Sequence, residues 1–289
     1  MPATYTPIRY PGGKTKLYPL IRDIIDQNEY NDRTYCEAFA GGAGAAMKLL
    51  LMEDVSSVII NDLDRAVYCM WDCIVNHSIA LCNFIDKVDV TVDSWKRFKA
   101  IYNNQGDATD KELGHAAFFL NRTNVSGILN GGVIGGVNQT GNYPINARFS
   151  KNNLKKKIRA IAKKKHSIEL YQLDVEDFID QVLKPRSNEI FCYFDPPYVQ
   201  KGPGLYKSSF NEKKHRVLAQ KILNSNFPWM ATYDDDPLVC ELYRGRLCDT
   251  LILDYSANIH GKGVEKLILS EGMQYKKPLN SSRIDSECS

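Results

Sequence analysis

The sequence lacks most of the features that would assign it directly to a class. Its eight cysteines form no CxxC pair and its five histidines are scattered, so no metal site of ordinary ligand spacing is indicated. No charged and apolar leader opens the chain, and no apolar run approaches the length that spans a bilayer. The formal net charge of +3 does not by itself indicate a nucleic-acid partner. These absences favour a cytoplasmic protein with reduced thiols, no bound metal and no membrane contact.

The first part of the chain has the pattern of a nucleotide-binding α/β fold. The 289 residues suffice for one α/β domain with a large insertion or for two domains. Apolar periodicity predicts a helix over 17–27. A short strand at 34–38 runs into the glycine-rich stretch 39–44 and a helix, and a second strand at 55–60 ends near Asp62. This order predicts the first half of a Rossmann-like site.

The rest of the chain predicts helices, a glycine-rich interruption and further strands. The pattern is mainly helical from about residue 65 to 130, and 127–149 then reads as a hairpin or long loop rich in glycine. A Lys/Arg-rich helix at 151–165 follows. Later strands are expected at 167–173, 190–194, 229–233, 247–253 and 265–270, before a polar tail.

The glycine loop and Asp62 together favour a cofactor that carries a nucleoside. A glycine-rich strand–helix turn lets the backbone approach a ligand at a helix N-terminus. The spacing is not GxGxxG, which argues against a nicotinamide dinucleotide. Asp62 has the position of a carboxylate that binds ribose hydroxyls, and capping of the following helix is the alternative interpretation of this residue.

The most specific motif is Asp195-Pro196-Pro197-Tyr198, which follows an apolar strand. Ligands of open α/β sheets bind where the strands end. The Asp195 carboxylate and the Pro196 carbonyl are two acceptors for the hydrogens of an exocyclic amine, and they would turn its lone pair toward an electrophile. The prolines fix the backbone and remove donors, and Tyr198 can stack on an extruded base. The motif predicts a site for an amine on a nucleobase.

Five segments resemble, in this order along the chain, the Dam-like (alpha-class) DNA adenine-N6 methyltransferases. They are Arg9–Lys14, Glu37–Gly44, Ile60–Asp62, Phe118–Arg122 and Asp195–Tyr198. The resemblance implies a Rossmann-like α/β fold, S-adenosyl-L-methionine as cofactor and double-stranded DNA as substrate. The implied reaction is direct methyl transfer to a flipped-out adenine, without a metal or a covalent enzyme intermediate.

The resemblance also assigns expected roles to individual residues of this sequence. Asp195, Pro196, Pro197 and Tyr198 match the catalytic motif. The expected cofactor-binding residues are Tyr10, Lys14, Phe39, Gly41, Gly42, Gly44, Asp62, Asp174, Val175 and Asp195. The expected DNA-binding residues are Asn121, Arg122, Asn130, Asn138, Gln139, Lys151 and Lys155.

The implied domain organisation places DNA recognition in an insertion. Residues 1–64 and 167–275 are expected to form the catalytic domain, 65–166 a mostly helical target-recognition insertion with a hairpin, and 276–289 a polar tail. The stretch 127–141 contains no Arg or Lys, unlike a GATC-reading hairpin, so its amides are the candidate readers of adenine. The basic segment 151–165 suits phosphate contact, with a solvated helix face as the alternative.

Two other function classes stay open from the sequence. One is a cytosine-N4 or RNA amino methyltransferase, against which the acid at position 195 argues. The other is a catalytically silent DNA-binding protein, against which the intact glycine loop and catalytic motif argue. Thr232-Tyr233 stands where the family has a Ser-Asn pair, and the acids 234–236 after it are read as a helix cap. A restriction or defence-system partner would leave no mark in this sequence.

Overall fold

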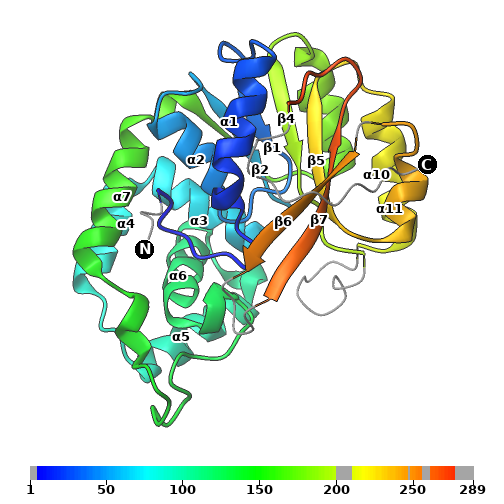
Figure 1. Cartoon of the computed structure of the whole chain (residues 1–289). Coiled ribbons are helices and arrows are strands. Elements are labelled where there is room, and N and C mark those ends of the chain that lie inside the picture. Colours follow the sequence, from blue (N-terminus) through cyan, green and yellow to red (C-terminus); the bar gives the residue numbers. More distant parts are fainter. Residues whose placement is uncertain (1–4, 200–209, 247, 256–260, 277–289) are drawn as a thin grey trace.

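The computed structural model describes residues 5–199, 210–246, 248–255 and 261–276 (Figure 1). Its strands are β1 (Thr34–Glu37), β2 (Val58–Asn61), β3 (Ile168–Tyr171), β4 (Ile190–Phe194), β5 (Trp229–Asp234), β6 (Cys248–Tyr255) and β7 (Gly261–Leu269). They form one seven-stranded sheet in the order β3-β2-β1-β4-β5-β7-β6. The first five strands pair in parallel, and β7 lies antiparallel between β5 and β6.

Helices cover both faces of the sheet, as a parallel sheet requires. On one face lie α1 (Tyr18–Gln27), α2 (Gly44–Leu51) and α3 (Arg65–Val75), and on the other α8 (Val175–Phe178), α10 (Glu212–Leu223) and α11 (Pro237–Leu242). Successive side chains of a strand point to opposite faces of the sheet, so they pack into two different hydrophobic cores. Tyr35 and Phe191 belong to the first core, whereas Cys36 and Cys192 belong to the second. Buried strands therefore read as apolar runs rather than as alternating ones.

A helical lobe lies beside the sheet, at the lower left of Figure 1. It contains α4 (Ser78–Lys87), α5 (Val92–Asn103), α6 (Asp110–Thr123) and α7 (Lys151–Lys163). Helix α6 starts at a capping box in which Thr109 and Glu112 bond each other's backbone N–H groups, a strong start signal. Most of its residues are buried, so α6 is the central helix of the lobe.

Several element boundaries differ from the prediction. Strand β2 begins at Val58 instead of Val55, because Glu53 has a left-handed φ of 62° in a turn and Val58 is the first residue to pair with β1. The predicted strands 247–253 and 265–270 are longer, since β6 and β7 pair with each other over their full length. The helix predicted over 17–27 is α1, preceded by the 3-10 turn η1 (Lys14–Leu17). Residues 277–289 of the predicted tail lie outside the described residues.

The glycine-rich stretch after α6 is largely irregular. The predicted hairpin has one antiparallel bridge, between Asn124 and Val133, and short 3-10 turns at Val125–Gly127 and Ile145–Arg148. The basic helix predicted next is α7, and its residues Leu154, Ile158 and Ile161 are buried. Across the described ranges, no helix combines the length and apolar character that a membrane span requires.

The sheet order creates a switch point between β1 and β4. From β1 the chain continues through α2 to β2 on one side, whereas from β4 it continues through α10 to β5 on the other side. The loops that leave β1 and β4 therefore diverge and open a crevice at the carboxyl ends of the strands. Ligands of open α/β sheets bind in this place.

Candidate active site

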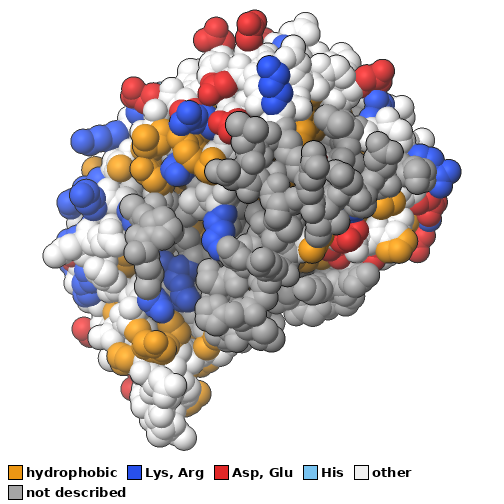
Figure 2. Space-filling view, in the orientation of Figure 1, with side chains coloured by type: hydrophobic (Ala, Val, Ile, Leu, Met, Phe, Trp, Pro, Cys, Tyr) orange, Lys and Arg blue, Asp and Glu red, His pale blue; other side chains and the backbone are white. Residues whose placement is uncertain are grey.

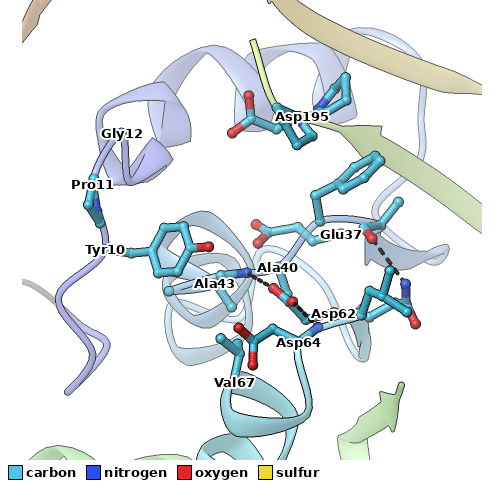
Figure 3. A pocket seen from close by; sticks show the side chains of 18 of the residues that line it. Tyr10, Pro11, Gly12, Glu37, Ala40, Ala43, Asp62, Asp64, Val67 and Asp195 are labelled. Carbon is cyan, nitrogen blue, oxygen red and sulfur yellow. Dashed lines mark hydrogen bonds between the residues drawn. The ribbon is translucent and has the colours of Figure 1, made fainter. Parts of the chain in front are cut away.

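A cavity of about 450 Å³ opens at this switch point (Figure 3). Its volume lies within the range of small-molecule and cofactor sites. Every residue predicted for the cofactor pocket and for the catalytic motif lines it. The structure thus brings together segments that lie far apart in the sequence, from Tyr10 near the N-terminus to Tyr198.

Glycines shape the loop between β1 and α2. Gly41 has φ +45°, and a Cβ there would lie 2.7 Å from the Tyr10 ring. A Cβ on Gly44 would lie 2.1 Å from the Thr15 hydroxyl oxygen. The loop therefore packs directly against the N-terminal segment and tolerates no side chain at these positions. The indole N–H of Trp71 donates to the Gly41 carbonyl at 2.9 Å, so this tryptophan also fixes the loop.

Asp62 holds the same loop from the end of β2. Its Oδ2 accepts a hydrogen bond from the Gly41 N–H at 2.8 Å, and its Oδ1 accepts one from the Asp64 N–H at 3.0 Å. Burial raises the pKa of this carboxyl to about 6. The cap of α3 is Asp64, whose side chain accepts from the Ala66 N–H, so the alternative capping role belongs to that residue.

Asp195 lies at the opposite end of the cavity, directly after β4. Its Oδ1 is 3.1 Å from the Lys14 ammonium and accepts a hydrogen bond of 3.2 Å from the Thr232 hydroxyl. Thr232 shares a 2.6 Å hydrogen bond with the Tyr193 hydroxyl, which fixes its orientation. Burial raises the pKa of Asp195 to about 6, against the opposing effect of the Lys14 charge.

A buried glutamate that the sequence reasoning missed completes this end of the cavity. Glu265 on β7 is 1% exposed, and its Oε1 lies 2.8 Å from the Lys14 ammonium. The same oxygen accepts a 2.5 Å hydrogen bond from the Tyr198 hydroxyl. One signal was present in the sequence. Glu265, Leu267 and Leu269 are two positions apart and share one face of the strand, and the two leucines are buried, so the acid also faces inward.

Glu37 is a second functional candidate that the sequence reasoning did not single out. It is the last residue of β1, is 5% exposed and lines the cavity (Figure 3). Its Oε1 accepts from the Ala46 N–H at 2.8 Å and from the Tyr35 hydroxyl at 3.4 Å. Burial raises its pKa to about 8, helped by the negative charge of Asp195. An acid at the end of a fully buried strand was the available signal.

The structure places Asn121 and Arg122 on α6, inside the helical lobe. The Asn121 amide donates to the carbonyls of Arg9 and Gly127, at 2.6 and 3.0 Å, and its oxygen accepts from the Arg9 N–H at 2.9 Å. The Arg122 guanidinium donates to the carbonyls of Arg148 and Pro7. Asn121 is 1% exposed, so its side chain ties α6 to the N-terminal segment.

The amides of the glycine-rich stretch differ in their surroundings. Asn130 is exposed, lines the cavity and accepts from the Lys99 ammonium at 3.2 Å. Asn138 is exposed. Gln139 donates to the carbonyls of Ile134 and Gly136 and accepts from the Ile145 N–H, so its side chain braces the loop itself.

The basic residues predicted on α7 are engaged with α4. Lys151 donates to the carbonyls of Asp86 and Val88, both at 2.9 Å, and Lys155 forms an ion pair with the Asp86 carboxylate. Both ammonium groups are thus engaged in contacts with the C-terminal end of α4. The two lysines therefore hold the lobe together in this structure.

A cluster of four cations, which we call the cationic cluster, lies beside the cavity and consists of Arg9, Arg122, Arg148 and Lys157. Burial and the neighbouring charges of Arg9 and Arg148 lower the pKa of Arg122 to about 9, and burial, together with the charge of Arg122, lowers the pKa of Lys157. Arg9, Arg122 and Lys157 donate hydrogen bonds to backbone carbonyls of neighbouring segments. Figure 2 shows Lys and Arg side chains gathered over the position of α6. The mutual effects on these pKa values show that the four positive charges lie close together.

No metal site is indicated in the part of the chain that the structure describes, where no three His, Cys, Asp or Glu side chains are grouped to hold an ion.

Comparison with known proteins gave one matching family model, and we describe one of the similar solved structures. A sequence model of the D12 class N6 adenine-specific DNA methyltransferase family matches residues 10–260. The solved structure is the rRNA methyltransferase aviRa from Streptomyces viridochromogenes, similar over 90% of this chain and 86% of that chain, at 11% identity and a TM-score of 0.41. No curated protein matches the chain.

Proposed function

Because the chain belongs to the D12 class N6 adenine-specific DNA methyltransferase family, we propose that it transfers a methyl group from S-adenosyl-L-methionine to an adenine rotated out of duplex DNA. The observation that carries the proposal is the cavity itself, which joins a glycine loop and Asp62 at one end to Asp195 at the other. A donor and an amine can meet between these two ends.

The residues around the glycine loop fit this cofactor. Each carboxylate oxygen of Asp62 uses one lone pair to accept a backbone N–H, and each keeps a second lone pair for a ribose hydroxyl. Asp174 and Val175 line the cavity nearby and would flank the adenine of the cofactor. Glu37 offers a buried carboxyl to the cationic groups of the donor. When bound, the cofactor supplies an electrophilic methyl group.

The groups around Asp195 fit the amine that accepts the methyl group. Lys14 and Thr232 both bond to Oδ1, and in the described part of the chain no residue donates to Oδ2. Oδ2 is therefore the oxygen that would accept one hydrogen of the adenine amine, with the Pro196 carbonyl accepting the other. The two acceptors would direct the amine lone pair at the methyl group, so positioning and electrostatics supply the catalysis.

Access to Asp195 requires that the base leave the helix. The Asp195 side chain is 21% exposed and lies at the bottom of a cavity, which a base stacked in a duplex cannot enter. Tyr198 stands beside it and would stack on the extruded ring.

The cationic cluster is the best-supported contact for the DNA backbone. Arg9 adjoins Tyr10 of the cavity wall, and its guanidinium donates to the Asn124 carbonyl at 3.1 Å, at the base of the glycine-rich stretch. The cluster would thus bind a phosphate close to the target base. Asn130 and Asn138 stay as candidates for base contacts, whereas we propose that Asn121 and Gln139 position the backbone that presents them.

The catalytic proposal is tested by Asp195→Ala. Labelled methyl transfer to DNA should be abolished, because the amine loses its principal acceptor, while DNA affinity should stay within about threefold. The control is Asp93→Ala, which removes a 94% exposed carboxylate on α5 and should leave the rate unchanged. Substantial methyl transfer by the Asp195→Ala protein would refute this mechanism.

The DNA-binding proposal is tested by the salt dependence of affinity. Arg148→Gln should weaken binding to all sequences alike and reduce the slope of log affinity against log salt by about one unit, since one phosphate contact is lost. Lys163→Gln removes the same charge from an exposed position of α7 and is the control. An equal slope for the two variants would argue against a phosphate contact at the cationic cluster.

A further inference from the structure

Strand β7 places one carboxylate, Glu265, directly against Lys14 and Tyr198 of the cavity wall. Glu265 pairs with Asp234 of β5 and with Leu251 of β6, so both neighbouring strands fix its backbone. Its side chain is 2% exposed. A carboxylate buried this deeply costs free energy unless charged or hydrogen-bonding partners compensate it, which points to a role beyond packing.

The hydrogen-bonding partners of Glu265 come from two segments that lie far apart in the sequence. Its Oε1 receives the Lys14 ammonium at 2.8 Å and the Tyr198 hydroxyl at 2.5 Å. Lys14 lies in the N-terminal segment and Tyr198 in the catalytic motif, 184 positions apart, and the two also bond each other at 3.3 Å. Glu265 therefore joins the N-terminal segment to the catalytic motif.

The same lysine connects Glu265 to Asp195. Its ammonium lies between Glu265 Oε1 and Asp195 Oδ1, at 2.8 and 3.1 Å. This bridge fixes which oxygen of Asp195 is occupied and which faces the cavity. It also holds the Tyr198 ring, because the ammonium lies 5.3 Å from the ring centroid while the hydroxyl is bound to Glu265.

We propose that Glu265 is a positioning residue of the methyl transfer: it holds Lys14 against Oδ1 of Asp195 and Tyr198 by its hydroxyl, so that Oδ2 and the tyrosine ring face the target base. This inference rests on the proposed function of the cavity. The proposed role of Glu265 goes beyond support of the fold, because the charge of Glu265 acts on Asp195 through Lys14.

The charge effect can be stated from the groups that surround Asp195. Lys14 faces it from η1 and lowers its pKa, and Glu265 faces it from β7 and raises its pKa. Glu37 from β1, Tyr193 from β4 and Thr232 from β5 complete the surroundings. Removing the charge of Glu265 should therefore lower the pKa of Asp195, because Lys14 then acts without the opposing carboxylate.

The experiment compares Glu265→Gln with the wild-type protein. Glutamine keeps the shape and an oxygen for the Tyr198 hydroxyl but lacks the charge. The titration of Asp195 is followed by carboxyl ¹³C NMR, assigned with an Asp195→Asn sample, and its midpoint should fall below the wild-type value of about 6. This readout needs no methyl transfer, so it separates the inference from the proposed function. An unchanged or higher midpoint overturns the inference.

Kinetics supply the second readout. Glu265→Ala removes both contacts, and kcat should fall on the order of a hundredfold, as expected when reacting groups are misplaced by about 1 Å. Glu271→Gln removes an 85% exposed carboxylate shortly after β7 and should change neither kcat nor the Asp195 midpoint. A kcat of Glu265→Ala within threefold of the wild-type value would also overturn the inference. If the alanine variant does not fold, the NMR comparison with Glu265→Gln decides.

Discussion

The sharpest test of the cofactor site is Asp62→Asn. Asp62 holds two backbone N–H groups, those of Gly41 and Asp64, with one carboxylate oxygen each. Asparagine has only one oxygen, so its NH₂ group must face one of these donors and that hydrogen bond is lost. The same substitution removes the negative charge that would bind the ribose hydroxyls.

The size of the effect follows from these contacts. A hydrogen bond to a charged group contributes about 1.5–3 kcal/mol. Losing one ribose contact should weaken S-adenosylmethionine binding about 10- to 150-fold, and losing one loop contact should lower the free energy of unfolding by a similar 1.5–3 kcal/mol. The two losses appear in separate measurements, calorimetric titration with the cofactor and denaturant unfolding without it.

A pH series adds a second check. Burial raises the pKa of Asp62 to about 6, and the ionised form accepts the hydroxyl hydrogens. Wild-type affinity should therefore be nearly full at about pH 7, about half at pH 6 and about tenfold lower at pH 5, which corresponds to about 1.4 kcal/mol. The Asp62→Asn protein should lack this fall. Asp64→Asn removes a neighbouring charge but keeps a good helix cap, and it should bind normally. Equal losses in the two variants, or Asp62→Asn binding within threefold of wild type, would refute the reasoning.

Two further predictions concern the buried carboxyls. With saturating cofactor, kcat/KM for DNA should fall as the pH drops below about 6, since burial raises the pKa of Asp195 and only its carboxylate accepts the amine; a flat profile down to pH 5 would contradict this. Cofactor binding at pH 7.5 should release on the order of 0.7 proton, because the cationic donor lowers the pKa of Glu37 from about 8. Calorimetry in two buffers measures the release, which Glu37→Gln should abolish, and a release that persists in Glu37→Gln would assign it to another group.

The parts of the fold that could be predicted are those with local signals. The glycine loop, the strand before it and Asp62 lie within about 30 residues, and their spacing predicted that they meet at one end of the sheet. The order of helices and strands also followed from periodicity. The start of β2 was wrong because pairing with Tyr35, rather than the apolar run from Val55, determines where the strand begins.

Contacts between distant segments could not be predicted in the same way. The ion pair of Lys14 with Glu265 spans 251 positions and depends on β7 lying antiparallel between β5 and β6. Lys151 and Lys155 are a second example. The basic segment 151–165 suited contact with phosphate or with solvent, and no signal in the sequence indicated that residues of α4 contact these two lysines. Only packing decides whether a lysine meets a carbonyl, a carboxylate or a phosphate.

The charges of the cavity explain why one lysine is buried among several acids. Lys14 compensates Asp195 and Glu265, and the protonated form of Glu37, whose pKa is about 8, adds no charge near neutral pH. The group of Lys14, Asp195 and Glu265 thus keeps one negative charge in excess before the cofactor arrives. A cationic donor would balance that charge. The acceptor end of the cavity is therefore expected to work best once the donor end is filled, an order of binding that product-inhibition kinetics would reveal.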